Sequence, residues 1–121
     1  MLTTAARTGD PVAALSSFGP LIDHWHATGL WTEVWLALRA LIDTLSRHGR
    51  HRDVAVLLGA YEASSRATPV YGPDANRLDA AGAGARDALG DEFDDLFAEG
   101  RAMTDDGAVL MARQLTRPSA R

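Results

Sequence analysis

Residues 29 to 49 constrain the fold of this chain more than any other stretch. Gly29 and Gly49 bound it, and a glycine at such a position is typical of a helix end. The apolar residues between the two glycines recur every three or four positions, which indicates one buried face of an α-helix. These residues are Trp31, Val34, Trp35, Leu38, Leu41, Ile42 and Leu45. The stretch therefore predicts a tight turn followed by a long helix from about Leu30 to His48.

The segment before Gly29 predicts a second helix with a kink. Asp10 and Pro11 are residue types that begin helices, and apolar residues at helical spacing follow them. Pro20 falls inside that pattern, and because proline lacks a backbone donor, it should either kink the helix or split it in two. The apolar spacing continues across Pro20, which favours the kink. Residues 1–8 are expected to form a frayed N-terminal segment.

A helix that opens near Asp53 has two different faces. Its apolar face carries Val54, Leu57, Leu58 and Tyr61, and its other face carries Ala55, Gly59, Ala60 and Ala63. Small residues in a row allow another helix to approach closely, but alanine also simply favours helix formation. The sequence leaves both interpretations of the small face open.

The second half of the chain predicts a loop and three more helices. Residues 67–74 contain two prolines and a glycine and predict the loop, and a helix is expected over residues 73–89. Gly90 ends that helix, and Asp91 is expected to cap the next. The buried stripe of this next helix comprises Phe93, Leu96 and Phe97. Thr104 and two aspartates predict the start of a last helix, and residues 116–121 are expected to form a disordered tail.

An internal repeat adds to this pattern. Two copies of a glycine turn, each followed by apolar residues five and nine positions on, lie 40 positions apart: Gly9, Ala14 and Phe18, then Gly49, Val54 and Leu58. Repeats of about 34 to 47 residues built from helix pairs are typical of α-solenoids. The sequence therefore predicts an all-α fold of five to seven antiparallel helices, stacked as hairpins in a single domain over residues 9–115.

Composition argues against several classes of function. The chain has no cysteine, and all 12 of its basic residues are arginines, so it lacks a thiolate nucleophile, a cysteine zinc site and a P-loop lysine. A net charge of −4 argues against direct binding to nucleic acid or an anionic membrane. No apolar run approaches the ~20 residues of a membrane span, and the N-terminus has no apolar signal core. A cytoplasmic location is expected.

The candidate sites favour interaction over chemistry. Asp23, His24 and His26 do not share a helical face in the way a metal site requires, and the acidic residues near the C-terminus predict a solvated face. We expect no enzyme activity, no metal and no cofactor. The tryptophans either form a core cluster or line an aromatic groove. The candidate interaction surface comprises Trp31, Trp35, Arg39 and Tyr61.

Several segments together are similar to a known family. They are Gly9 to Pro11, Leu57 to Ala60, the loop from Pro69 to Pro73, the alanine-rich Leu78 to Leu89, and Ala98 to Arg101. In this order they resemble the C-terminal tetratricopeptide-like region of large bacterial signalling ATPases, the LuxR-type and adenylate-cyclase-linked transcription regulators. The chain departs from that pattern at Pro20 and at Gly107, where a glutamate often completes the last cap.

The resemblance implies a function without catalysis. It implies a helical interaction or sensor module that binds a protein, a peptide or a small effector, or that packs on the ATPase core of a parent regulator. The alternative is a structural role as a self-association module, with a weak homodimer as its product. The chain carries neither a nucleotide-binding motif nor a helix-turn-helix motif, so neither activity is assigned to it.

Overall fold

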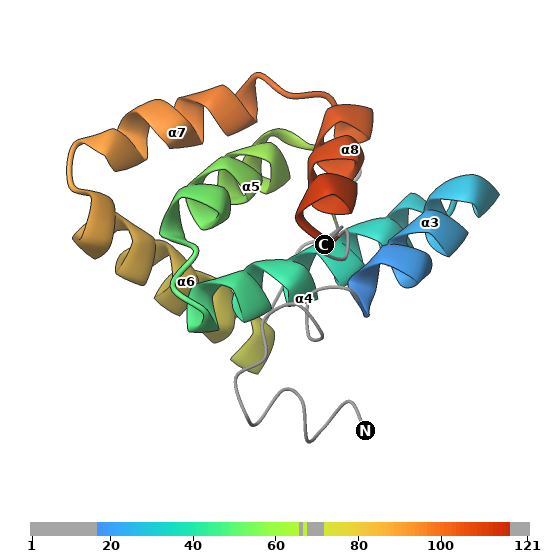
Figure 1. Ribbon diagram of the computed structural model, residues 1–121, viewed down its shortest axis with the longest axis horizontal. Coiled ribbons are helices and arrows are strands. Elements are labelled where there is room, and N and C mark those ends of the chain that lie inside the picture. Colours follow the sequence, from blue (N-terminus) through green and yellow to red (C-terminus); the bar gives the residue numbers. More distant parts are fainter. Residues whose placement is uncertain (1–16, 66, 68–71, 117–121) are drawn as a thin grey trace, which may run out of the picture.

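The computed structural model describes residues 17–65, 67 and 72–116, and every regular element in this part is an α-helix (Figure 1). The helices are α3 (Phe18–Thr28), α4 (Trp31–Arg47), α5 (His51–Ala63), α6 (Pro73–Leu89), α7 (Glu92–Arg101) and α8 (Asp105–Thr116). The predicted all-α class is confirmed. Some of the expectations concern residues outside the described part. They are the frayed segment 1–8, the helix start at Asp10, the first copy of the repeat up to residue 14, most of the loop, and the tail beyond residue 116.

Two glycine turns hold α4 between its neighbours in the way the sequence predicts. Gly29 has a φ of 74° and Gly49 a φ of 75°, a left-handed conformation that glycine adopts without steric cost. In each turn the next amide reaches back across the helix end: Leu30 N donates to Trp25 O at 3.1 Å, and Arg50 N donates to Leu45 O at 2.9 Å. Both turns are therefore Schellman motifs, which satisfy carbonyls that a helix end leaves free.

The prediction of a kink at Pro20 is not what the described residues show. Helix α3 begins at Phe18, so Pro20 occupies its first turn. Backbone amides in a first turn have no partner within the helix, and the missing donor of proline therefore costs nothing there. The regular apolar spacing around Pro20 concealed a helix boundary.

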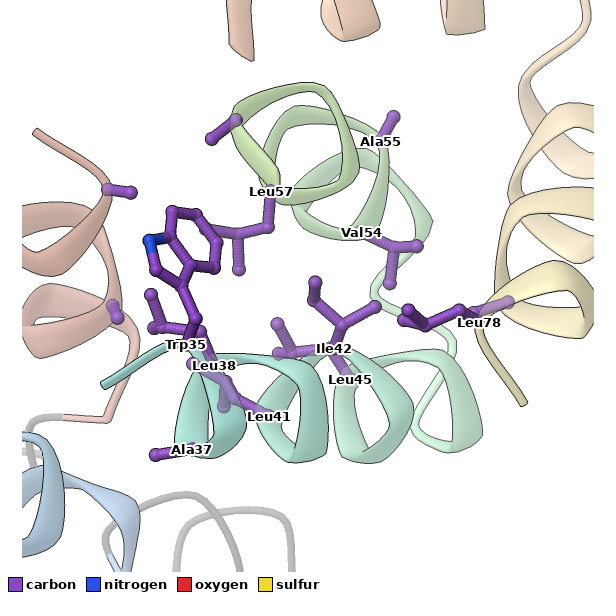
Figure 2. Close-up of a cluster of buried hydrophobic side chains, with 14 of the residues drawn as sticks. Trp35, Ala37, Leu38, Leu41, Ile42, Leu45, Val54, Ala55, Leu57 and Leu78 are labelled. Atoms are coloured by element: carbon purple, nitrogen blue, oxygen red, sulfur yellow. The ribbon is translucent and has the colours of Figure 1, made fainter. Parts of the chain in front are cut away.

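The core lies between the inner face of α4 and the helices that cover it. Figure 2 shows Trp35, Ile42 and Leu45 of α4 directed toward α5, with Leu78 of α6 closing one end. The stripe read from the sequence is almost entirely inaccessible to solvent: Val34, Leu38, Leu41, Ile42 and Leu45 are all 0% exposed. Burial of such side chains stabilises the fold by roughly 1.5–3 kcal/mol each, so this face of α4 provides much of the stability of the fold.

Helices α5 and α7 touch backbone to backbone, and two glycines make this contact possible. A Cβ added to Gly59 would overlap the carbonyl oxygen of Phe97, and one added to Gly100 would overlap the carbonyl oxygen of Val56. Only glycine permits such an approach. The interpretation of the small face of α5 as a site of close helix approach is therefore confirmed.

The last helix returns to the first described one. Helix α8 packs against α3 (Figure 1), with Arg113 Nε 2.9 Å from Asp23 Oδ1 and His26 Nε2 3.1 Å from Asp106 Oδ1. Solenoid repeats contact only their neighbours along the chain, so the α3–α8 contact joins helices that simple stacking would keep apart.

The caps of α7 and α8 differ from each other. Asp91 lies at the N-cap position of α7 but makes no side-chain hydrogen bond there, so its expected capping role is wrong. The hydroxyl of Thr104 accepts a hydrogen bond from Gly107 N at 3.0 Å, which is the cap predicted for the last helix. None of the helices in the described part has the length and apolarity needed to cross a bilayer.

Candidate interaction site

Trp35 belongs to the core and drops out of the candidate interaction surface. Its side chain is 1% exposed, and its ring meets the edge of Tyr61 with 5.8 Å between centroids. The indole Nε1 donates to Asp105 Oδ1 at 3.2 Å, and Ser64 Oγ donates to the same oxygen at 2.5 Å. Asp105 thus ties α4, the end of α5 and the first turn of α8 together. The side chain of Trp35 therefore has no surface available for contact with a partner.

The other two tryptophans are half-buried beside histidines. Trp25 meets His24 edge-on with 4.7 Å between ring centroids, and Trp31 meets His26 edge-on at 5.5 Å. Both rings pack against the core and keep some exposure, so they agree with the core-cluster interpretation more than with an aromatic groove. The two histidines serve as packing partners for the indoles.

A first hollow opens over α5, α6 and α7, and we call it the aromatic hollow. It encloses about 550 Å³ and is lined by Leu58, Tyr61, Glu62, Ala75, Leu78, Asp79, Gly82, Ala83, Arg86, Phe93 and Phe97. Phe93 and Phe97, one turn apart on α7, stack with their centroids 5.6 Å apart and form one wall. The lining residues of α6 include the small residues Ala75, Gly82 and Ala83.

Charged groups mark the rim of the aromatic hollow. Glu62 and Asp79 bring carboxylates to it. The guanidinium of Arg86 lies 4.3 Å from the centroid of Phe93 and 3.3 Å from an oxygen of Asp94. A guanidinium over an aromatic face is attracted by the ring, so Arg86 also supports the position of Phe93.

A second hollow lies on the outer face of α4, and we call it the arginine hollow. It encloses about 380 Å³ and is lined by Phe18, Leu36, Arg39, Ala40, Asp43, Thr44, Arg47, Arg77 and Leu78. Arg47 pairs with Asp43 at 3.1 Å. Nη1 of Arg39 is buried and finds no acceptor in the part of the chain that the structure describes.

The four candidate residues therefore do not form one surface. Tyr61 lines the aromatic hollow and touches Trp35, while Arg39 lines the arginine hollow on the opposite side of α4 from the core. Trp31 stands with His26 beside the α3–α4 turn. The sequence assigned Phe93 and Phe97 to a buried stripe, and the structure agrees for Phe93, which is 3% exposed. Phe97 is half-buried and packs against the core, and both rings contribute to the lining of the aromatic hollow, which the sequence did not indicate.

Within residues 17–65, 67 and 72–116, no group of three or more histidine and carboxylate side chains is placed to share a metal ion. Asp95 and Glu99 are exposed on α7, away from either hollow. What the two hollows offer a ligand is apolar surface with a few charges at the rim, which is the usual composition of a binding pocket.

Comparison with known proteins adds no relative, since no family model, no curated protein and no solved structure matches this chain.

Proposed function

We propose that this chain is a non-catalytic helical interaction module that binds an apolar segment of a protein or peptide in the aromatic hollow. The observation that carries the proposal is the hollow itself. Its volume of about 550 Å³ falls within the roughly 300–1,000 Å³ of ligand pockets. The half-buried rings of Phe97 and Tyr61 line it, with the buried Phe93 stacked against Phe97, and aromatic side chains dominate binding energy at protein interfaces.

The rim of the hollow suggests the chemistry of the ligand. Glu62 and Asp79 contribute negative charge beside the rings, and the cation of the lining, Arg86, is already engaged by Asp94 and Phe93. A segment with a large apolar side chain next to a lysine or arginine would complement this lining. Opposite charges across an interface favour the right partner and speed association more than they add raw affinity.

The regulator context rests on the sequence resemblance. In this proposal the helices form tetratricopeptide-like hairpins, which the short glycine turns on either side of α4 support. The parent protein would be a LuxR-type or adenylate-cyclase-linked signalling ATPase, and the hollow would bind either its ATPase core or a separate protein. The sequence of the native gene tests this context: an upstream P-loop domain supports it, and an autonomous short gene contradicts it.

A matched pair of variants tests the binding function. Peptides selected from a display library against the immobilised chain would be measured on wild type, Ala83→Trp and Ala88→Trp. Both alanines are exposed on α6, but only Ala83 lines the hollow. We expect Ala83→Trp to weaken the selected peptides about tenfold or more and Ala88→Trp to leave them unchanged. Peptides that bind all three proteins equally would contradict the proposal.

Self-association is the second candidate, and exposed leucines on α3 and α8 favour it. Leu110 is 56% exposed and Leu21 is 43% exposed, and their helices pack against each other. Val109, next to Leu110 on α8, is buried and contributes to the core. Light scattering should show a mass that rises with protein concentration, and Leu110→Glu should remove the rise. A strictly monomeric wild type at high concentration would contradict this candidate.

A further inference from the structure

We propose that the aromatic hollow binds an arginine side chain of its ligand between Glu62 and Asp79, and that this contact fixes the direction in which the ligand lies. The inference rests on the proposed function, because it specifies the ligand of that same site. It names one cationic residue type and assigns it to one end of the hollow.

Helices α5 and α6 line the hollow in opposite directions. A Cβ added to Gly82 would lie 3.5 Å from Leu58 Cδ1, and one added to Gly84 would lie 3.9 Å from His51 Cε1. The contact nearer the C-terminus of α6 is therefore made by the residue nearer the N-terminus of α5. Motion along α5 toward its C-terminus leads toward the N-terminus of α6.

This antiparallel arrangement brings two carboxylates to the same end of the hollow. Glu62 lies one turn after Leu58 on α5, and Asp79 lies three residues before Gly82 on α6. Since Leu58 and Gly82 are in contact, Glu62 and Asp79 both lie beyond that contact in the same direction, and both line the hollow. We call this part of the aromatic hollow its acidic end.

The opposite end carries a cation that already has partners. Helix α7 begins near the start of α5, where Arg52 of α5 pairs with Glu92 of α7 (Figure 1). The next residue, Phe93, lies under the guanidinium of Arg86 at 4.3 Å, and Arg86 is 3.3 Å from an oxygen of Asp94. The lining therefore has a compensated cation at one end and carboxylates at the other.

The acidic end is not neutralised by the part of the chain that the structure describes. Glu62 and Asp79 are both exposed, and neither has a hydrogen bond or an ion pair there. Like charges that line one space repel each other, so a cation placed between them interacts favourably with both. The charge that complements this end is therefore positive and belongs to the ligand.

The neighbouring rings favour arginine over lysine. Tyr61 precedes Glu62, and the backbone of Phe97 lies against Gly59, less than one turn earlier on α5. A guanidinium can stack on an aromatic ring while its N–H groups donate to carboxylates, whereas an ammonium is a compact, strongly hydrated charge. The chain uses the same combination at the other end, where Arg86 contacts both a ring and a carboxylate.

Peptide selection gives the first test. A randomised phage-display library would be selected on wild type and on the double variant Glu62→Gln/Asp79→Asn. We expect arginine beside a large apolar residue to be enriched on wild type and not on the double variant. Asp87→Asn is the matched control, because Asp87 is exposed on α6 but does not line the hollow. It should select the same arginine-bearing peptides as wild type.

Affinities of one arginine-bearing peptide give the second test, by fluorescence anisotropy. Glutamine in place of its arginine should weaken binding to wild type about tenfold or more, lysine should weaken it several-fold, and added salt should weaken the original peptide. A peptide with glutamate at that position should bind wild type poorly and regain affinity in Glu62→Arg, because the two charges are then exchanged. Unchanged melting curves of the variants ensure that a loss of affinity is not a loss of fold.

The direction of the ligand gives the third test. A nitroxide spin label attached to the peptide next to its arginine broadens the NMR signals of nearby amides. We expect stronger broadening at Glu62 and Ala75 than at Arg86 and Phe93. Equal broadening at both ends would contradict a fixed direction.

The outcomes separate this inference from the proposed function. Peptides that lose affinity in Ala83→Trp but bind Glu62→Gln/Asp79→Asn like wild type would support binding in the hollow and contradict the arginine contact. A lysine peptide that binds as tightly as the arginine peptide would contradict the choice of arginine. Peptides indifferent to Ala83→Trp, or a library that yields no binder, would contradict the proposed function and the inference with it.

Discussion

At the scale of single residues, Trp35 has the largest fully buried side chain in the described part of the molecule. Replacing it with alanine leaves a cavity that the surrounding helices cannot fully close. We expect Trp35→Ala to lower the free energy of unfolding by roughly 3–5 kcal/mol, out of a total of ~5–15 kcal/mol for such a domain. Thermal melts would measure the change. A variant that melts like wild type would show that the ring is not core.

Asp105 allows a sharper test, because Asp106 beside it is a natural control. Both carboxylates lie in the first turn of α8 and interact with its dipole in the same way. Asp105 also accepts the hydrogen bond from buried Trp35, whereas Asp106 makes only an exposed pair with His26. We expect Asp105→Ala to cost about 1–3 kcal/mol and Asp106→Ala about 1 kcal/mol or less. If urea unfolding gave the two variants equal stability, the proposed role of Asp105 in linking α4, α5 and α8 would be contradicted.

At the scale of elements, the close contact between α5 and α7 depends on glycine at positions 59 and 100. Gly100→Ala inserts a methyl group against the backbone of α5 and should destabilise the protein by about 1–3 kcal/mol or more. Gly84→Ala is the control, because its added Cβ meets nothing closer than 3.9 Å. That change should stabilise α6 by about 0.5–1 kcal/mol. Urea unfolding should therefore move the two midpoints in opposite directions.

The helices and their ends were largely predictable from the sequence, because local signals determine them. Glycines that can adopt positive φ marked the turns around α4, and Pro73 marked the start of α6. The start of α3 was misread, because Pro20 fits the apolar spacing of a continuous helix and that of a first turn equally well. Local patterns distinguish poorly between a kink and a boundary.

The long-range contacts were not predictable in the same way. The hydrogen bond from Trp35 to Asp105 spans 70 positions, and nothing in the neighbourhood of either residue indicates the other. The aromatic hollow likewise requires both α6 and α7 to lie beside α5, and the glycine contact sets the distance between α5 and α7. The same holds for the candidate surface: Trp35 is buried in the core, whereas Tyr61 and Arg39 line different hollows.

At the scale of the whole molecule, the two faces of α4 have separate roles. The inner face holds the core and the outer face lines the arginine hollow, while the aromatic hollow lies beyond α5. Most core residues line neither hollow, but Leu78 and Phe93 belong to the core and also line a hollow. A change that fills a hollow should alter affinity without unfolding the protein, and a change in the core should do the reverse.

The most direct test of the proposed function is a map of where a bound peptide lies. A ¹⁵N-labelled chain would be titrated with one of the display-selected peptides, and its amide resonances followed by NMR. We expect shifts to cluster around Leu58 to Glu62 of α5, along the lining residues of α6 and at Phe93 to Phe97 of α7, while α3 and α8 stay unchanged. Shifts confined to α3 and α8, or spread evenly over the molecule, would contradict binding in the aromatic hollow.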